Sequence, residues 1–237
     1  MANILIVDDE KDLADLLKEI VETEGFKGDV AFDGNSALER LEETKFDLAL
    51  LDIRLPGMNG VELFLKIKEK APDCKVIMMT GFAVEDLIEQ AMVSGAYGCI
   101  HKPFNPRRII EMIRKTLLSD KMILVVDDEA GIRDFLSEQL KMEGFNVLSA
   151  KDGEEALAIL KRNRVNLILL NFCLPDMDGL LLFKKARNIY EDIKVLLITG
   201  YDLTQILQRE EARWLYGSMK KPIDFGSLLD VMRKVII

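Results

Sequence analysis

The sequence contains few of the residues that bind transition metals or cross-link a chain: one histidine and three cysteines among 237 residues. The cysteines, Cys74, Cys99 and Cys173, show no CxxC spacing, and the histidine is His101. A structural zinc site needs several cysteine or histidine ligands, so this composition argues against one. We expect the cysteines to be small, buried hydrophobic side chains in a reducing compartment.

Long apolar runs and a signal-type start are also missing. No stretch approaches the roughly 20 apolar residues that a membrane-spanning helix needs. After Met1-Ala2-Asn3 the chain passes straight into a strand-like run, without a basic segment and an apolar core of a signal peptide. We therefore expect a cytoplasmic protein that does not contact membranes. The net charge of −9 argues against direct nucleic-acid binding, because phosphate contacts need clustered cations.

The strongest pattern that is present is an internal repeat at an offset of 119 residues. The segment ILIVDDE at residues 4–10 returns as ILVVDDE at residues 123–129. The same offset relates three further dipeptides: Leu55-Pro56 to Leu174-Pro175, Thr80-Gly81 to Thr199-Gly200, and Lys102-Pro103 to Lys221-Pro222. A duplication of this length predicts two domains, residues 1–119 and 120–237, each with its own core.

Each copy alternates short apolar runs with amphipathic stretches, in five strand–helix pairs. In the first copy we expect strands at about 3–7, 27–31, 47–51, 75–79 and 97–101, and helices at about 11–24, 35–43, 60–70, 84–94 and 105–118. The second copy repeats the same breaks. Strict alternation with short connections predicts an α/β fold, in which helices cover both faces of a parallel sheet.

The unusual polar residues of the first copy fall at the ends of the predicted strands. Asp8 and Asp9 end the first strand, Asp52 the third, Thr80 the fourth and Lys102 the fifth. In parallel α/β sheets these strand ends meet at one edge, where ligands bind. We therefore expect the five side chains to lie close together, in a single site.

Three carboxylates at one point repel one another and hold their protons unless a cation is present. A hard divalent ion such as Mg²⁺, or Mn²⁺ in its place, accepts carboxylate and carbonyl oxygens and also binds phosphate. We predict that Asp9 and Asp52 are direct metal ligands and that Asp8 acts through water. The main-chain carbonyl of Arg54 would add a further oxygen.

The same residues suggest phosphoryl transfer. Asp52 can attack a phosphoryl group as a nucleophile and form an acyl phosphate. Lys102 would supply a second positive charge to the phosphoryl oxygens, since this chemistry depends on positioning and charge neutralisation. The Thr80 hydroxyl would swing in to bind a phosphoryl oxygen, which would make the loop around Thr80 a switch.

With this set of residues, each copy resembles the receiver domain of two-component response regulators over essentially its whole length. The resemblance rests on the Asp-Asp pair, the central Asp, the Thr, the Lys-Pro and the segment LPGMNG at residues 55–60. It implies two flavodoxin-like, doubly wound (βα)₅ domains with strand order 2-1-3-4-5. It also implies that Asp52 accepts phosphate from a sensor histidine kinase or a histidine phosphotransfer protein.

The resemblance carries two further implications. A receiver is a signalling switch and not a classical enzyme, although it catalyses its own phosphorylation and commonly its own dephosphorylation. Receivers also often pair through their fourth and fifth elements, so a homodimer is an expected state. One departure concerns the aromatic switch residue that receivers often carry three positions before the lysine: Cys99 and Ser218 stand there in the two copies.

The second copy keeps Asp127, Asp128, Thr199 and Lys221 but has Asn171 in place of the acceptor aspartate. An amide is a very poor nucleophile, so this copy resembles a pseudo-receiver that serves docking, dimerisation or regulation. The two retained aspartates leave weak magnesium binding open. Near the fourth helix, Trp214-Leu215 replaces Gly95-Ala96 of the first copy. We expect Trp214 to add core packing, with an interface anchor as the alternative.

Two other functions compete with the signalling switch. A metal-dependent phosphohydrolase of the haloacid-dehalogenase type needs a second acid two residues after its nucleophile, and Arg54 stands there instead. A non-phosphorylated scaffold or adaptor protein with a vestigial site is the other alternative. The complete set of site residues argues against that alternative for the first copy and favours it for the second.

Overall fold

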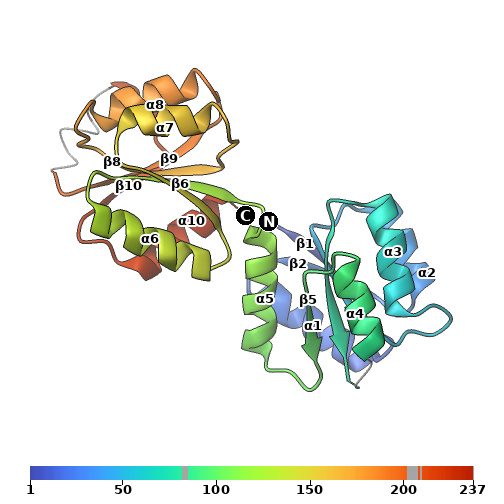
Figure 1. Cartoon of the computed structure of the whole chain (residues 1–237). Helices are drawn as coiled ribbons and strands as arrows, with labels where there is room; N and C mark the ends of the chain where they lie inside the picture. Colours follow the sequence, from blue (N-terminus) through green and yellow to red (C-terminus); the bar gives the residue numbers. More distant parts are fainter. Residues whose placement is uncertain (82–84, 202–207, 209, 237) are drawn as a thin grey trace. The chain divides into compact units, whose positions relative to one another are not determined.

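The computed structural model describes residues 1–81, 85–201, 208 and 210–236. The chain divides into two compact units, Met1–Leu117 and Leu118–Ile237 (Figure 1). Each unit contains one five-stranded parallel sheet, and the strand orders are β2-β1-β3-β4-β5 and β7-β6-β8-β9-β10. The predicted fold class and strand order are therefore confirmed for both copies. Among the described residues, no helix is long and apolar enough to cross a membrane.

The elements of the first unit follow the predicted alternation. Its strands are β1 (Asn3–Val7), β2 (Lys27–Ala31), β3 (Leu48–Asp52), β4 (Lys75–Thr80) and β5 (Gly98–His101). Its helices are α1 (Lys11–Thr23), α2 (Gly34–Glu43), α3 (Gly60–Lys70), α4 (Glu85–Val93) and α5 (Pro106–Leu118). Observed and predicted boundaries differ by only a few residues. The strands β3 and β4 each extend one residue further than predicted, so that they end on Asp52 and Thr80 themselves.

The second unit repeats this order with one difference. Its strands are β6 (Met122–Val126), β7 (Asn146–Ala150), β8 (Leu167–Asn171), β9 (Lys194–Thr199) and β10 (Gly217–Lys220). Its helices are α6 (Ala130–Met142), α7 (Gly153–Leu160), α8 (Gly179–Arg187) and α10 (Phe225–Ile236). A 3₁₀ helix, η1 (Glu210–Trp214), lies at the end of the segment that corresponds to α4. The earlier part of the fourth helix predicted for this copy lies largely outside the described residues.

Buried strands form the centre of each unit. All five residues of β3 and all five of β8 are buried, as expected of parallel strands with helices on both faces. In the first unit, α1 and α5 lie on one face of the sheet and α2, α3 and α4 on the other (Figure 1). In the second, α6 and α10 share one face while α7 and α8 share the other.

Capping side chains set where two helices of the first unit begin. Asp33 accepts hydrogen bonds from the main-chain N–H groups of Asn35 and Ser36 at the start of α2, both at 2.9 Å. Asn59 accepts in the same way from Val61 and Glu62 at the start of α3. Such caps satisfy N–H groups that have no partner within the helix. The Asn59 cap also fixes the start of α3 directly after the loop that follows β3.

The prediction that Trp214 adds to the core is wrong. Its side chain is 56 % exposed, and the guanidinium groups of Arg187 and Arg213 lie 4.7 and 5.3 Å from its ring centroid. The η1 segment turns the indole outwards, where it lines a surface pocket of about 700 Å³ together with residues of α8. Trp214 is therefore a surface feature of the second unit.

Candidate functional site

The site of the first unit lies at the carboxyl edge of its sheet. The strands β1, β3, β4 and β5 are paired in register there, so that Asp52 lies opposite Met79 and Thr80 lies opposite His101. The side chains that follow or end these strands meet at this edge. They include Asp8, Asp52, Thr80 and Lys102, which the sequence predicted to converge.

Lys102 joins two buried carboxylates. Its Nζ lies 2.6 Å from Asp8 Oδ2 and 3.3 Å from Asp52 Oδ1, and Glu10 lies at the rim at 3.8 Å. The Asp8 side chain is 0 % exposed and that of Asp52 only 8 %. Taking such charges out of water is costly unless they are paired. The lysine is therefore the counter-ion that lets two carboxylates share one enclosed position.

Even with this lysine, the ionised form of Asp52 remains electrostatically unfavourable. Burial raises the pKa of Asp52, the charge of Asp8 raises it further, and the positive charge of Lys102 only partly opposes them. Burial alone would lower the pKa of Lys102, but its hydrogen bond to Asp8 and the charges of Asp52 and Asp8 together raise it. Lys102 therefore stays protonated at neutral pH, and the site favours any further cation that stabilises ionised Asp52.

The carboxylate cluster has the composition of a divalent-cation site. One oxygen each from Asp8, Asp9 and Asp52 lies within 4.8 Å of the others. Asp9 is exposed, whereas the other two are buried, so the cluster opens to solvent on the Asp9 side. Three carboxylates against one lysine leave an excess of negative charge, and hard oxygen ligands are those that Mg²⁺ prefers. The residues of this cluster therefore fit the expected ion.

Two predicted site residues, Arg54 and Thr80, contribute main-chain hydrogen bonds to the site. Arg54, exposed just after β3, donates its main-chain N–H to the Asp52 carboxylate, which helps to orient the carboxylate and lowers the pKa of Asp52 against the larger effect of burial. Thr80 is 2 % exposed at the end of β4, and its main-chain oxygen accepts the N–H of Lys102 at 2.6 Å. This hydrogen bond links the end of β4, which carries Thr80, to the segment after β5, which carries Lys102.

Gly60 has a positioning role that the sequence motif alone did not disclose. A Cβ at residue 60 would lie 2.1 Å from the main-chain oxygen of Asp52 and 2.9 Å from Ile53 Cα. The Gly60 N–H also donates to the Ile53 oxygen at 2.8 Å. Only glycine allows the start of α3 to approach the backbone of the acceptor residue so closely. The only sign of this role in the sequence is that the glycine recurs as Gly179 in the second copy.

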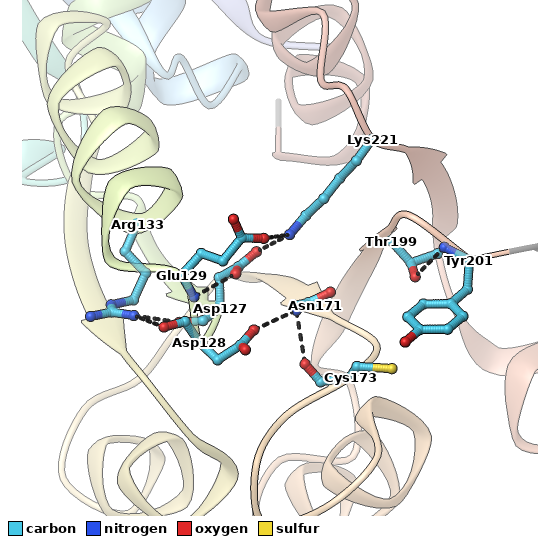
Figure 2. A network of polar contacts seen from close by, with 9 residues as sticks. All are labelled: Asp127, Asp128, Glu129, Arg133, Asn171, Cys173, Thr199, Tyr201 and Lys221. Atoms are coloured by element: carbon cyan, nitrogen blue, oxygen red, sulfur yellow. Dashed lines mark hydrogen bonds and ion pairs between the residues drawn. The ribbon is translucent and has the colours of Figure 1, made fainter.

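The second unit keeps the lysine half of this arrangement. Lys221 Nζ lies 2.8 Å from Asp127 Oδ2 and 3.3 Å from Glu129 Oε1. A residue that the sequence did not single out, Arg133, adds a second cation. Its Nη1 donates to the main-chain oxygens of Asp127 and Asp128 at 2.7 and 2.9 Å (Figure 2).

The acceptor position of the second unit is closed by hydrogen bonds. Asn171 Nδ2 donates to Asp128 Oδ1 at 2.9 Å and to the main-chain oxygen of Cys173 at 2.8 Å (Figure 2). The buried Thr199 hydroxyl accepts the main-chain N–H of Tyr201 at 3.1 Å. The residues predicted for the degenerate site thus all lie at the same sheet edge, where Lys221 pairs with Asp127, Asn171 with Asp128, and Thr199 with Tyr201.

Comparison with known proteins agrees with this geometry. The family profile of the response regulator receiver domain matches twice, at residues 4–114 and 123–233. The chain is 32 % identical to sporulation initiation phosphotransferase F of Bacillus subtilis over 119 residues, which are 50 % of this chain and 96 % of that protein. It is 27 % identical to a response regulator receiver protein of Anaeromyxobacter over 243 aligned residues, covering 99 % of this chain and 95 % of the relative.

Other relatives share one domain. The transcriptional regulatory protein CpxR of Escherichia coli is 40 % identical over 117 residues, or 49 % of this chain and 50 % of CpxR. A CheY-like receiver structure from Methanospirillum hungatei is 39 % identical, has a TM-score of 0.48, and covers 49 % of this chain and 94 % of its own. Receiver domains are phosphorylation-dependent signalling switches of two-component systems, not classical enzymes. The chain belongs to the response regulator receiver family and carries its domain twice in tandem.

Proposed function

We propose that residues 1–119 form the phosphorylated switch of a two-component system and that Asp52 is its phosphoacceptor. The observation that carries this proposal is the pairing of Asp52 with Lys102 at 3.3 Å, inside a cluster of three carboxylates. The phosphodonor would be a sensor histidine kinase or a histidine phosphotransfer protein, the donors of receiver domains in two-component systems. The phosphodonor domain of such a protein faces the cytoplasm, so this protein would be cytoplasmic.

The reaction at Asp52 is a displacement at phosphorus. An oxygen of the ionised carboxylate attacks the phosphorus of a phosphohistidine, an oxygen–phosphorus bond forms, and the phosphorus–nitrogen bond breaks. The bonding electrons return to the imidazole, which takes a proton. Because burial and Asp8 raise the pKa of Asp52, the cations of the site have to keep this carboxylate ionised.

The chain's own residues divide the remaining work. Asp8, Asp9, Asp52 and the main-chain carbonyl of Arg54 would hold Mg²⁺, or Mn²⁺ in its place. A bound divalent ion would neutralise the charge on the phosphoryl oxygens. Lys102 would exchange its contact with Asp52 for one with a phosphoryl oxygen, since its Nζ already lies beside the carboxylate. Hydrolysis of the acyl phosphate by the same site would reset the switch.

The α4–β5 surface is the proposed output of the switch, and a second copy of the chain is its proposed occupant. Thr80 lies at the end of β4 and would bind a phosphoryl oxygen, which would draw the following loop inwards. Three apolar side chains near α4 and β5 are notably exposed: Met92 by 43 %, Val93 by 83 % and Tyr97 by 47 %. An exposed apolar patch of this kind is best covered by another apolar surface, and the same patch on a second copy of the chain is one.

Residues 120–237 would serve as a docking or regulatory module that does not accept phosphate. The amide at position 171 cannot act as a nucleophile, and both of its N–H groups are already engaged. The exposed Trp214 with its two flanking arginines is a surface feature that the first copy lacks, since Gly95 stands at the corresponding position there.

Intact-mass analysis of the full chain tests the proposal. Wild-type protein incubated with Mg²⁺ and acetyl phosphate should gain one phosphoryl group, and Asp52→Asn should gain none. Asp127→Asn is the matched control in the second unit and should gain one group at the wild-type rate. The adduct of the wild type should then decay after the donor is removed. No adduct on a wild-type chain that binds beryllofluoride would favour the scaffold function instead.

Sedimentation velocity tests the proposed dimer. With beryllofluoride as a phosphoryl mimic, the wild type should shift towards a dimer, and Val93→Glu should stay monomeric because a charge replaces the most exposed apolar residue of the patch. A wild-type chain that sediments as a monomer with and without the mimic would refute the dimer.

A further inference from the structure

The amide of Asn171 occupies a notable position in the second unit. The residue is 8 % exposed at the end of β8. Its Nδ2 donates one hydrogen bond to Asp128 Oδ1 and another to the main-chain oxygen of Cys173 (Figure 2). A primary amide has two N–H donors, and here both point at oxygens of the site.

The two oxygens that receive these hydrogen bonds have counterparts in the first unit. Subtracting the repeat offset of 119 relates Asn171, Asp128 and Cys173 to Asp52, Asp9 and Arg54. The carboxylate of Asp9 and the main-chain carbonyl of Arg54 are two of the oxygens proposed to hold the divalent ion. In the second unit, one NH₂ group therefore satisfies the oxygens that an ion would need.

The charge balance of the second site differs in the same direction. The first site has a cluster of three carboxylates and one cation, Lys102. On α1 of the same unit, residue 14 is a buried alanine and carries no charge. In the second site, Asn171 removes one negative charge, and Arg133, which corresponds to Ala14, adds a positive one. The guanidinium lies within 2.9 Å of the main-chain oxygens of Asp127 and Asp128. A divalent cation therefore loses most of its electrostatic attraction to this site.

From this network we infer that the second receiver site is closed to divalent cations, because the Asn171 amide takes the place of the ion. The inference deepens the proposed function and rests on it for the meaning of the site. An ion could enter only after two hydrogen bonds break, one of them to a charged acceptor, which weakens binding by about 100-fold or more. The second unit is thus held in one state whatever the magnesium concentration.

Counting bound Mn²⁺ by electron paramagnetic resonance on the full chain tests this inference. The wild type should bind one ion, at the first site. Asp9→Asn should abolish that ion and reveal no other at concentrations up to about 100 times those that fill the first site. Asp9→Asn with Asn171→Asp should regain one ion, now at the second site. Adding Arg133→Ala should tighten the regained ion further.

Unfolding of the second unit gives an independent reading. Trp214 is the only tryptophan in the sequence, so its fluorescence reports on this unit alone. In the Asp9→Asn chain, Mg²⁺ should leave the urea midpoint of the Trp214 signal unchanged. With Asn171→Asp added, Mg²⁺ should raise that midpoint, since ligand binding to the folded state stabilises it.

The outcomes separate this inference from the proposed function. A comparably tight ion that persists in Asp9→Asn and is lost when Asp128→Asn is added would overturn the inference. It would also be overturned if Asn171→Asp gained neither an ion nor a Mg²⁺-dependent midpoint while keeping the wild-type Trp214 unfolding transition. A wild type without any bound ion would instead contradict the metal site proposed for the first unit. The effect of Asn171→Asp on ion binding by the Asp9→Asn chain would still test the inference about the second unit.

Discussion

Replacing the site lysines by methionine should destabilise the two units unequally. Lys102 compensates two buried carboxylates, Asp8 at 2.6 Å and Asp52 at 3.3 Å. Lys221 compensates one, Asp127 at 2.8 Å, whose side chain is 4 % exposed. Methionine keeps the length and packing of the lysine stem but removes the charge, so the comparison isolates the electrostatic contribution.

The expected magnitudes follow from burial. Removing one partner of a buried ion pair costs about 3–5 kcal/mol, because a charge is left buried without compensation. Lys221→Met leaves one such carboxylate and should cost about 3 kcal/mol, at the low end of this range. Lys102→Met leaves two mutually repelling carboxylates and should cost about 5 kcal/mol at neutral pH. Protonation of Asp52 relieves the repulsion, so the excess cost at Lys102 should shrink as the pH falls through the raised pKa of Asp52.

Hydrogen exchange measured by mass spectrometry resolves the two units in the intact chain. Peptides from β1 and β3 report on the first unit, and peptides from β6 and β8 on the second. The costs above correspond to losses of protection of roughly four and two powers of ten, respectively. Added Mg²⁺ should restore part of the protection in Lys102→Met. Equal losses at the two lysines, or a loss at Lys102 below about 1 kcal/mol, would refute the claim that this lysine compensates two buried charges.

Three further predictions concern stability. Gly60→Ala should lower the free energy of urea unfolding by more than about 3 kcal/mol, because the added Cβ would lie 2.1 Å from a main-chain atom. Gly179→Ala should lower it by only about 1 kcal/mol, because the nearest atom lies at 3.0 Å. Equal costs at the two positions would contradict this reasoning. Asp52→Asn should raise the free energy of unfolding at pH 7. Burial, followed by the charge of Asp8, raises the folded-state pKa of Asp52, so the wild type loses stability as pH rises through that pKa. The advantage of the variant should vanish below the unfolded-state pKa of about 3.9, and a pH-independent advantage would argue against the charge as its cause. Asp33→Ala should lower thermal stability by about 1 kcal/mol through loss of the α2 cap, and no change would mean that the cap is replaced by water.

The parts of the account that depend on periodicity and repetition could be predicted from the sequence. The apolar runs that end in Asp8, Asp52 and Thr80 are visible in the sequence itself and predict strands. The parallel α/β arrangement then places these three residues at one edge of the sheet. The repeat offset carried the same prediction to the second unit without further information. Strand ends were predicted to within one residue where the polar residue itself completes the strand, as at Asp52.

The remaining features depend on distances that no residue pattern contains. The contact of Gly60 with the Asp52 backbone is set by how α3 approaches β3, which is a property of the folded unit. The second hydrogen bond of the Asn171 amide requires the Cys173 carbonyl to point towards it, in addition to the one that Asp128 accepts. Trp214 was expected to add core packing, with an interface anchor as the alternative, but it ends the η1 segment with its side chain exposed beside two arginines.

The central claim is that Asp52, and no other carboxylate, accepts the phosphoryl group. Borohydride reduction of the phosphorylated wild-type chain converts an aspartyl phosphate to homoserine, which peptide mass spectrometry locates at single-residue resolution. The account predicts homoserine at position 52 and unmodified residues at Asp8, Asp9, Asp127 and Asp128. Homoserine at any of those four positions, with Asp52 intact, would contradict it.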